Sequence, residues 1–258
     1  MKFMSFDFKK HRSILSKKTA LILGNGPSLN NVDFEILKSK KEIVTFSTNR
    51  IADVCRDNNW FPDFYTSFFS EPLKGKSYIT PDKKKIFYEG DLKKAVDTQN
   101  DIKYITNNEK TICFVHLWHK LFLKERKNLY FIKPKKWDRF KDFPKKGLER
   151  YQIPRNFLWH SATTPLLQLC LFFKFSNIGI IGQDGYKFEE SNNHYKGYRG
   201  NEHQSTEKII RANNSINLLH NSFKYSIEKY NLNVYNLSEK SILNQYKTLE
   251  IREFLERF

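Results

Sequence analysis

A short apolar run that ends in a glycine-rich turn constrains the fold of this chain more than any other feature. Residues 20–23 read ALIL, and residues 24–28, which follow directly, read GNGPS. Buried parallel strands read as short apolar runs, and glycines let the backbone turn sharply and approach a ligand. Open α/β sheets hold nucleotides where such strands end. The turn therefore predicts a ligand site, with a tight turn that binds nothing as the alternative.

The turn lacks both standard phosphate-binding fingerprints. The third glycine of a G-x-G-x-x-G motif would fall at Leu29, and no Gly-Lys-Ser/Thr ending of a Walker A loop follows. What remains is the amide of Asn25, held between Gly24 and Gly26 and followed by Ser28. An amide offers both a donor and an acceptor, so the turn favours the edge of a nucleotide or sugar over a bare phosphate.

The charge of the chain narrows the classes of partner. It carries 45 Lys and Arg against 28 Asp and Glu, a net charge of +17. This excess favours phosphorylated substrates, polyanions or an anionic membrane surface, unless it only reflects a bias towards Lys, Asn, Phe and Ile. Basic and aromatic residues alternate between positions 118 and 146, which fits a membrane surface or single-stranded nucleic acid. Because no nucleic-acid-binding motif accompanies them, we favour a membrane-proximal role and expect no nucleic-acid partner.

Length and cysteine content bound the organisation and compartment. With 258 residues, 39% of them hydrophobic, we expect residues 1–258 to form a single domain. Cys55, Cys113 and Cys170 are odd in number and far apart, which favours a reducing cytoplasm over disulfides or a zinc site. The first 18 residues are polar and basic, unlike a signal peptide, and no segment reaches the ~18 apolar residues of a membrane span. We therefore expect a cytoplasmic protein.

Strand-like and helix-like segments alternate along the chain. Strands are predicted at residues 20–23, 42–48, 62–69, 85–88, 102–105, 177–182 and 233–237, and helices at 32–40, 51–58, 161–175, 206–230 and 239–258. Residues 1–18 are expected to form a leader or a short helix. This order predicts an α/β fold, a mainly parallel sheet with helices on both faces. Residues 108–155 are rich in Lys, Trp and His and have poor periodicity, so we expect a lid or insertion of irregular and helical pieces, or else a solvated loop.

Polar residues follow several predicted strands, where open α/β sheets bind ligands. Asn25 and Asn49 could bond a base or a ribose, although Asn49 could instead only form an Asx turn. Arg50 could pair with a phosphate or carboxylate, or with a surface acid. Asp184 could orient a sugar hydroxyl or a base, or could serve as a cap or turn former. The chain has no Asp-x-Asp motif, which weakens a metal-dependent reaction, and we predict no metal and no cofactor.

Proton-transfer groups lie in a polar loop predicted at residues 189–204. It contains His194, Tyr198 and His203, and histidine is the usual general base near neutral pH. His160 precedes the predicted helix at 161–175 and could bind an anion, while Ser161 is its expected N-cap. His116 and His119 are spaced for a metal, but without a third ligand we interpret them as surface residues.

Several of these motifs together resemble the family-42 glycosyltransferases, the bacterial sialyltransferases of surface glycans. The matching segments, in family order across roughly residues 20–243, are GNGPSL at 24–29, FSTNR at 46–50, the strand at 64–69, the Ser-led helix at 161–173, the I-x-G-x-D-x-Y strand end at 180–186 and HYKGY at 194–198. The related MptE-like/DUF115 group, which includes a pterin pyrophosphokinase and flagellin-modifying Maf proteins, shares the GxGPSL start and the strand order.

The resemblance to the sialyltransferases implies a Rossmann-like GT-A variant with a lid and a metal-independent, inverting transfer from a CMP-sugar. It implies that Asn25, Gly26 and Asn49 contact the nucleotide, that Ser161 lies near the donor and that Tyr186 assists the departing phosphate. A glycan or lipid-linked glycan of a bacterial capsule or lipooligosaccharide would be the acceptor, and the enzyme would be cytoplasmic or peripheral at the inner membrane. The oligomeric state stays open, a homo-oligomer included.

The chain departs from the family pattern at three places. Tyr198 stands where the family has its catalytic His, which leaves His194 or a displaced His203 as the base. Thr66-Ser67 replaces an Asn-Pro pair, and His160 replaces an Arg. The donor sugar therefore stays open between sialic acid, another nonulosonic acid and Kdo. An MptE-like pyrophosphokinase, a transferase of another activated group and a polyanion-binding module are the alternatives.

Overall fold

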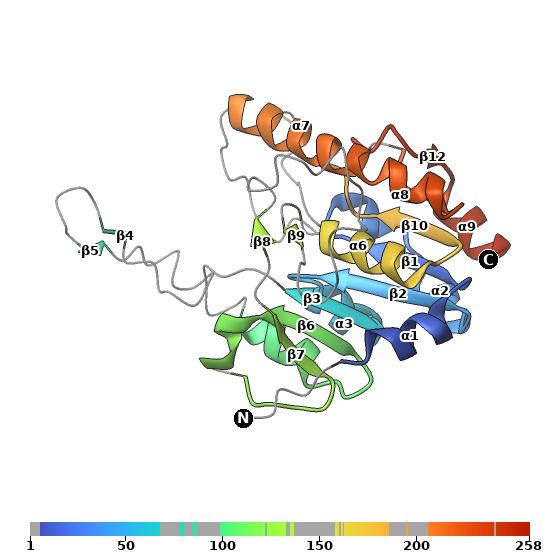
Figure 1. The fold of residues 1–258 in the computed structure, drawn as a ribbon. Helices are drawn as coiled ribbons and strands as arrows, with labels where there is room; N and C mark the ends of the chain where they lie inside the picture. Colours follow the sequence, from blue (N-terminus) through green and yellow to red (C-terminus); the bar gives the residue numbers. More distant parts are fainter. Residues whose placement is uncertain are drawn as a thin grey trace.

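An eight-stranded sheet forms the centre of the chain in a computed structural model (Figure 1). The structure describes residues 6–67, 78–79, 85–86, 99–121, 123–132, 135–136, 158–159, 161, 163–185, 195, 206–239 and 241–258. Every strand pair within this sheet is parallel. Its strands are β1 (Thr19–Leu23), β2 (Ile43–Thr48), β3 (Phe64–Ser67), β6 (Ile112–His116), β7 (Leu129–Ile132), β10 (Asn177–Ile181), β11 (Asn233–Asn236) and β12 (Lys247–Thr248).

The strand order shows a Rossmann-like topology. It runs β12-β11-β10-β1-β2-β3-β6-β7, so the chain builds the sheet outward from β1 to β7 and later outward on the other side from β10 to β12. The direction of winding reverses between β1 and β10. Ligands of doubly wound sheets bind in the crevice at such a switch point, beyond the carboxyl ends of the strands. The predicted α/β fold with a parallel sheet is confirmed.

Side-chain alternation along β1 explains the two cores. All of β1 is buried; Ala20 and Ile22 belong to one apolar cluster, whereas Leu21 and Leu23 belong to the other. Successive side chains of a strand point to opposite faces, so a strand covered on both faces loses polar alternation. This is why the ALIL run could be identified as a buried parallel strand.

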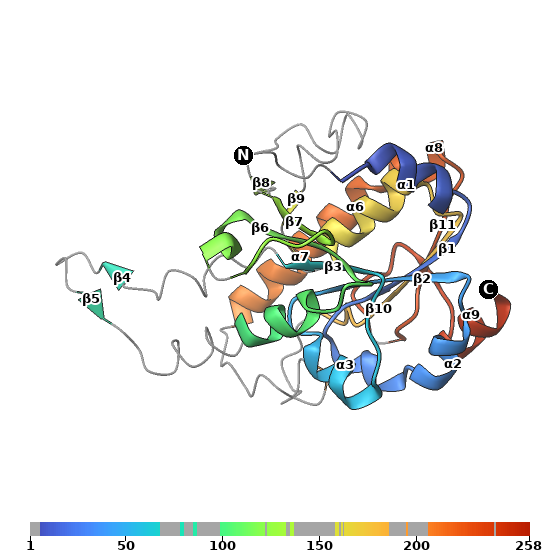
Figure 2. The same ribbon diagram turned by 90° about the horizontal axis from the view of Figure 1, so that it is seen from below.

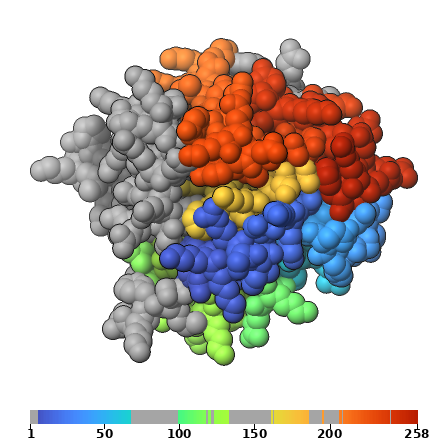
Figure 3. All heavy atoms as spheres, turned by 45° about the vertical axis from the view of Figure 1, so that its right-hand side comes forward, coloured from blue at the N-terminus to red at the C-terminus, as the bar shows by residue number. Residues whose placement is uncertain are grey.

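Helices cover both faces (Figure 2). One layer contains α1 (Phe8–Leu15), α6 (Thr164–Phe173), α7 (Thr206–Ser222) and α8 (Lys224–Lys229), and the other contains α2 (Phe34–Ser39), α3 (Ala52–Asn58), a helical segment at 99–106 and α9 (Ile251–Arg257). In the first layer α1 lies beside α6, below α7 and α8 in Figure 3. Stacked and edge-on rings among Phe6, Phe8, Phe114 and Tyr130 attach α1 to the sheet, which accounts for part of the high Phe content.

Two predictions between β3 and α6 are wrong. Residues 102–105, expected as a strand, are helical, since Ile102 and Ile105 are buried at a spacing of three that suits a helix. Strands β6 and β7 lie within residues 108–155, which were expected to be irregular and helical; β6 is buried at its three central residues, and β7 pairs with it at the edge of the sheet. Most of the remainder of that stretch is outside the described residues.

Smaller differences concern element ends. The strand expected at 85–88 is only β5 (Lys85–Ile86), which pairs with β4 (Tyr78–Ile79) apart from the main sheet. The helix expected at 206–230 is interrupted at Phe223, and the C-terminal helix expected at 239–258 is reduced to α9, because Lys247 and Thr248 pair with β11. Among the described residues, we find no helix with the length and apolar character needed to cross a bilayer.

Candidate functional site

The glycine turn touches the end of β10 at the switch point. Gly24 N donates to Ile181 O at 2.8 Å, and Gly26 N donates to Gly182 O at 2.8 Å. A Cβ on Gly24 would lie 2.3 Å from Gly182 O, which is backbone and cannot rotate away. Glycine at this position is therefore required by close approach of two chain segments.

Ser28 and Asp184 lock this contact in place. Ser28 Oγ accepts from Gly182 N at 2.9 Å, and Ser28 N donates to Asp184 Oδ2 at 2.9 Å. Ser238 Oγ, after β11, donates to the other carboxylate oxygen of Asp184 at 2.6 Å. Asp184 is buried, with both oxygens engaged inside the protein. Asp184 therefore joins the segments that follow β1, β10 and β11. This is a structural role, which the sequence analysis gave as the alternative to ligand binding.

Asn25 presents an unsatisfied buried acceptor at the same turn. Its Nδ2 donates to Thr48 O at 3.1 Å, whereas its Oδ1 has no hydrogen-bond partner among the described residues. The residue is only 9% exposed. A buried polar atom without a partner costs about 1–3 kcal/mol, and such atoms in native structures call for an explanation. A ligand that donates a hydrogen bond at this point would supply one.

Tyr195 connects the predicted polar loop at 189–204 to this turn. Its backbone N donates to Asn25 O at 2.8 Å, and its hydroxyl lies 3.4 Å from Asp57 Oδ2 at the end of α3. Tyr195 is buried and is the one residue of that loop among the described residues. The chain neighbour of His194 thus lies against the backbone of Asn25.

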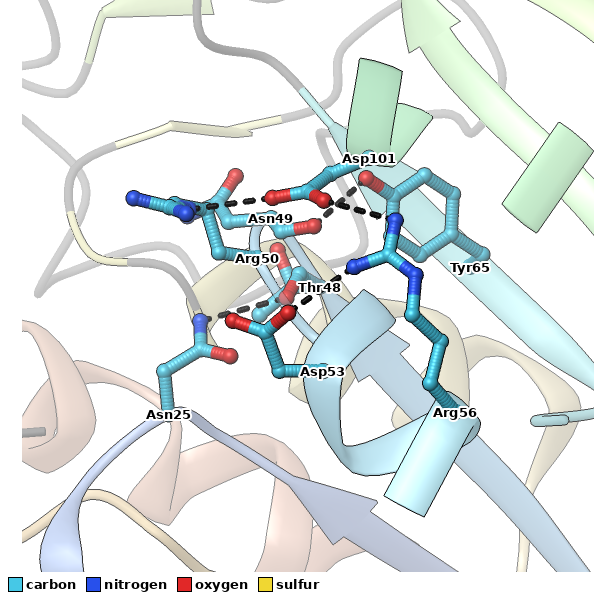
Figure 4. Close-up of polar contacts among 8 residues, drawn as sticks. All are labelled: Asn25, Thr48, Asn49, Arg50, Asp53, Arg56, Tyr65 and Asp101. Carbon is cyan, nitrogen blue, oxygen red and sulfur yellow. Dashed lines mark hydrogen bonds and ion pairs between the residues drawn. The ribbon is translucent and has the colours of Figure 1, made fainter. Parts of the chain in front are cut away.

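The carboxyl end of β2 carries Asn49 and Arg50 (Figure 4). Asn49 has a left-handed backbone with φ of 52°, and Tyr65 donates to its carbonyl at 2.7 Å. Asparagine tolerates this conformation better than most residues. Arg50 Nε then donates to Asp101 Oδ2 at 3.0 Å, and this pair is largely buried. The predicted alternative, a salt bridge of Arg50 at the surface, is correct in that Arg50 pairs with an acid, Asp101, but the pair is largely buried and not at the surface.

Asp101 and Arg56 are functional candidates that the sequence analysis missed. Arg56 Nη2 donates to Asp101 Oδ1 at 3.1 Å, and its Nη1 donates to Asp53 at 2.8 Å. Burial is the largest single influence on Arg56 and lowers its pKa, but the hydrogen bonds and negative charges of Asp101 and Asp53 together outweigh it and raise the pKa of Arg56. The Arg56–Asp53 spacing on a predicted helix was a usable signal. Asp101 gave none because its segment was expected to be a strand.

Ser161 and the start of α6 lie beside the turn. Ser161 is buried and its Oγ lies 2.7 Å from Thr164 Oγ1. The N-cap is Thr163 rather than the expected Ser161, and Thr163 bonds the side chain of Gln183 and packs near Gly24. The predicted residues His160, Tyr186, His194, Tyr198 and His203 lie outside the described residues.

A half-open cavity of about 440 Å³ lies on the other side of the turn. Its walls follow the carboxyl ends of β1, β10, β11 and β12. They are formed by Pro27, Ser28, Asn31, Asp184, Leu237, Ser238, Glu239, Leu249, Glu250, Ile251 and Arg252. The residues at its floor, Asp184 and Ser238, already bond each other.

Neither a cysteine nucleophile nor a metal site is indicated within the described part of the chain. All three cysteines are free and buried, and burial raises their pKa, so they are poor nucleophiles. Among the residues that the structure describes, no group of three His, Cys, Asp or Glu could hold a metal ion.

Comparison with known proteins gives a likeness of fold. No protein-family model and no curated protein sequence matches the chain. The structure is similar to that of the MAf glycosyltransferase from Magnetospirillum magneticum AMB-1, with a TM-score of 0.50 and 13% identity over 91% of this chain and 34% of that one. It also matches the sialyltransferase CstII from Campylobacter jejuni, determined with the substrate analogue CMP-3FNeuAc, with a TM-score of 0.41 and 14% identity over 90% of this chain and 86% of that one. This chain thus spans about a third of the MAf protein, with which it shares a Rossmann-like glycosyltransferase fold.

Proposed function

We propose that this chain is a glycosyltransferase that uses a CMP-activated sugar, sialic acid or a related nonulosonic acid or Kdo. The observation that carries the proposal is the unpaired, buried Oδ1 of Asn25 at the switch point of the sheet. A cytosine amine or a ribose hydroxyl could donate to it. The shared fold with the MAf glycosyltransferase supports a transferase, and the choice of CMP rests on the family-42 motifs of the sequence.

The proposed reaction is a single displacement with inversion. The acceptor hydroxyl attacks the anomeric carbon as the bond from that carbon to the phosphate oxygen breaks, and the electron pair leaves with CMP. The acceptor proton passes to a base, for which His194, Tyr198 and His203 are the candidates. The contact of Tyr195 with Asn25 supports a base from this loop.

The proposed donor contacts divide by chemistry. Asn25, Asn49 and the backbone of Gly24 and Gly26 would bind the nucleoside, while Arg50, His160, Ser161 and Tyr186 would face the phosphate. Asp184 and Ser28 would act by fixing the turn. We expect no metal requirement. The acceptor would be a glycan or lipid-linked glycan, and the basic residues between 118 and 146 would hold the enzyme at an anionic membrane.

A nucleotide-binding experiment with matched variants tests this proposal. We expect CMP to raise the Tm of the protein by several degrees at 100 times its Kd, with UMP, GMP and AMP weaker by tenfold or more in affinity. Asn25→Ala should lose the stabilisation by CMP. Asn31→Ala, which removes an exposed amide that lines the cavity on the other side of the turn, should keep it. Equal responses to all four nucleotides, or stabilisation by ATP with Mg²⁺ alone, would overturn the CMP-sugar assignment.

A product assay then separates transfer from binding. Release of CMP from CMP-sialic acid or CMP-Kdo should continue in excess EDTA and should fall by at least 100-fold when the true base among His194, Tyr198 and His203 is replaced. If EDTA abolishes release and Mg²⁺ restores it, the metal-independent mechanism is wrong.

A further inference from the structure

A network of four charges lies at the carboxyl end of β2, beside the unpaired Oδ1 of Asn25. Asp101 is at its centre, with Arg50 on one carboxylate oxygen and Arg56 on the other (Figure 4). The side chain of Asp101 is 6% exposed and that of Arg50 is 14% exposed, whereas Arg56 and Asp53 are 41% and 37% exposed. The two inner members are therefore removed from water and the two outer members are not.

Burial of this kind is a poor means of stabilising a fold. Removing two charges from water costs several kcal/mol per ion, which their attraction offsets only with very good geometry. Replacing a buried ion pair by well-packed apolar residues is often neutral or stabilising. The position of the pair at the edge of the sheet where ligands bind gives a different reason for it.

The geometry fixes the direction of the Arg50 guanidinium. The contact with Asp101 uses Nε of the guanidinium. Figure 4 shows Arg50 and Arg56 on opposite sides of the Asp101 carboxylate, with the far end of Arg50 directed away from Asp101. Arg56 is itself held by Asp53 and by the ring of Tyr104, whose centroid lies 4.6 Å from its Cζ. Asp101 thus cannot swing without breaking contacts on both sides.

The chain path places this guanidinium near Asn25. Asn25 Nδ2 donates to the carbonyl of Thr48, which lies two residues before Arg50. The residue between them, Asn49, accepts a hydrogen bond at its carbonyl from the Tyr65 hydroxyl. One short edge of the sheet therefore presents an unpaired acceptor and an oriented cation. A nucleotide has matching groups, a nucleoside donor and a phosphate.

We propose that Arg50 binds the phosphate of the nucleotide and that Asp101 is a positioning residue that orients Arg50 for it. The identity of the nucleotide rests on the proposed function, but the anion site does not. Arg56 and Asp53 hold Asp101 from the far side and do not contact the ligand.

The test uses three probes: CMP, cytidine and inorganic pyrophosphate. Arg50→Ala should weaken CMP at least tenfold and cytidine less than twofold, and should abolish stabilisation by pyrophosphate. Asp101→Asn should weaken CMP three- to tenfold with the same indifference to cytidine, and Asp101→Glu should recover part of the loss. In an Arg50→Ala background, Asp101→Asn should have no further effect on CMP, because it acts only through Arg50.

Matched controls come from another Arg–carboxylate pair. Arg252 Nε donates to Glu256 at 2.9 Å in an exposed pair on α9, so Arg252→Ala and Glu256→Gln remove the same kinds of group at another place. Both should leave all three affinities unchanged within twofold. If Arg50→Ala and Arg252→Ala weaken pyrophosphate equally, the anion is bound by general basic charge and the proposal is wrong.

The outcomes separate this inference from the proposed function. Pyrophosphate binding that depends on Arg50, without selective binding of CMP, would keep the anion site and reject the CMP-sugar assignment. CMP binding that is insensitive to Arg50→Ala would keep the CMP-sugar assignment and reject the anion site. A wild-type protein that does not bind pyrophosphate would also reject the anion site. If Asp101→Asn does not fold, Asp101→Glu decides: wild-type affinity for CMP in that variant would reject a positioning role.

Discussion

The two halves of the carboxyl edge of the sheet differ in how their polar groups are satisfied. On the β10–β12 side, a cavity of about 440 Å³ is present, but both oxygens of the buried Asp184 are already bonded within the protein. On the β1–β3 side, Asn25 keeps a buried unpaired acceptor next to the buried Arg50–Asp101 pair. Space alone therefore does not identify the binding half. The half with unfulfilled hydrogen-bonding capacity is the better candidate, and the satisfied half is the structural support of the turn.

The largest expected effect is loss of stability on substitution of the turn itself. A Cβ at Gly24 meets backbone at 2.3 Å, so Gly24→Ala should destabilise by about 3 kcal/mol or more, the upper end for overpacking. At Gly26 a Cβ would lie 2.3 Å from Asp184 Oδ2, a side-chain atom, while the nearest backbone atom, Gly182 O, would be 2.9 Å away, so the backbone clash is weaker than at Gly24. Urea denaturation should therefore show Gly26→Ala to be milder. Equal destabilisation by both would mean that backbone contact does not set the requirement.

The next effect concerns the satisfied half. Asp184→Ala removes a carboxylate that accepts from Ser28 N and Ser238 Oγ, and hydrogen bonds to charged groups contribute about 1.5–3 kcal/mol each. We expect a loss of about 3 kcal/mol in the free energy of unfolding. At a temperature where the variant is folded, its affinity for CMP should fall less than that of Asn25→Ala. The reverse order would place the ligand on the Asp184 side.

A separate prediction concerns acid sensitivity, which we expect at the buried His220 of α7. Burial lowers the pKa of His220 to about 3, and the Tyr246 hydroxyl, just before β12, lies 3.1 Å from its Nδ1. The unfolded chain binds this proton below pH ~6.5 and the folded chain does not. Stability from this group is complete above that pH and falls by up to ~1.4 kcal/mol per unit as the pH drops towards 3.

Urea denaturation at pH 7 and pH 5 measures the contribution of His220 to the free energy of unfolding. Relative to wild type, His220→Gln should regain about 2 kcal/mol on going from pH 7 to pH 5. A variant with the same pH dependence as wild type would show that His220 is not the proton-linked group. Wild-type CMP affinity at pH 7 in His220→Gln would confirm that the residue acts on the fold alone.

The sequence predicted the sheet better than it predicted the site, for a physical reason. Buried parallel strands such as β1 and β10 are local apolar runs, and the turn at 24–28 is local as well. Asp101 is distant in the chain from its partners Arg50 and Arg56, and only folding of residues 99–106 as a helix brings them together. Likewise, nothing local to Asp184 reveals that Ser238 occupies one of its oxygens. β6 and β7 were missed because they lie within a stretch of sequence rich in Lys, Trp and His whose periodicity is poor.

The smallest expected change in stability accompanies the sharpest change in binding, at Asn25. Asn25→Ala removes one hydrogen bond to Thr48 but also removes a buried unpaired acceptor, and these contributions of about 1 kcal/mol oppose each other. We expect the free energy of unfolding to change by less than about 1 kcal/mol, while the affinity for CMP falls by at least tenfold, which is about 1.4 kcal/mol. Calorimetric titration alongside urea denaturation measures both quantities on one sample, with Asn31→Ala as the matched amide control. A variant that is more stable than wild type and yet binds CMP normally would show that Oδ1 is simply an unpaired atom, and would remove the distinction between the two halves of the edge.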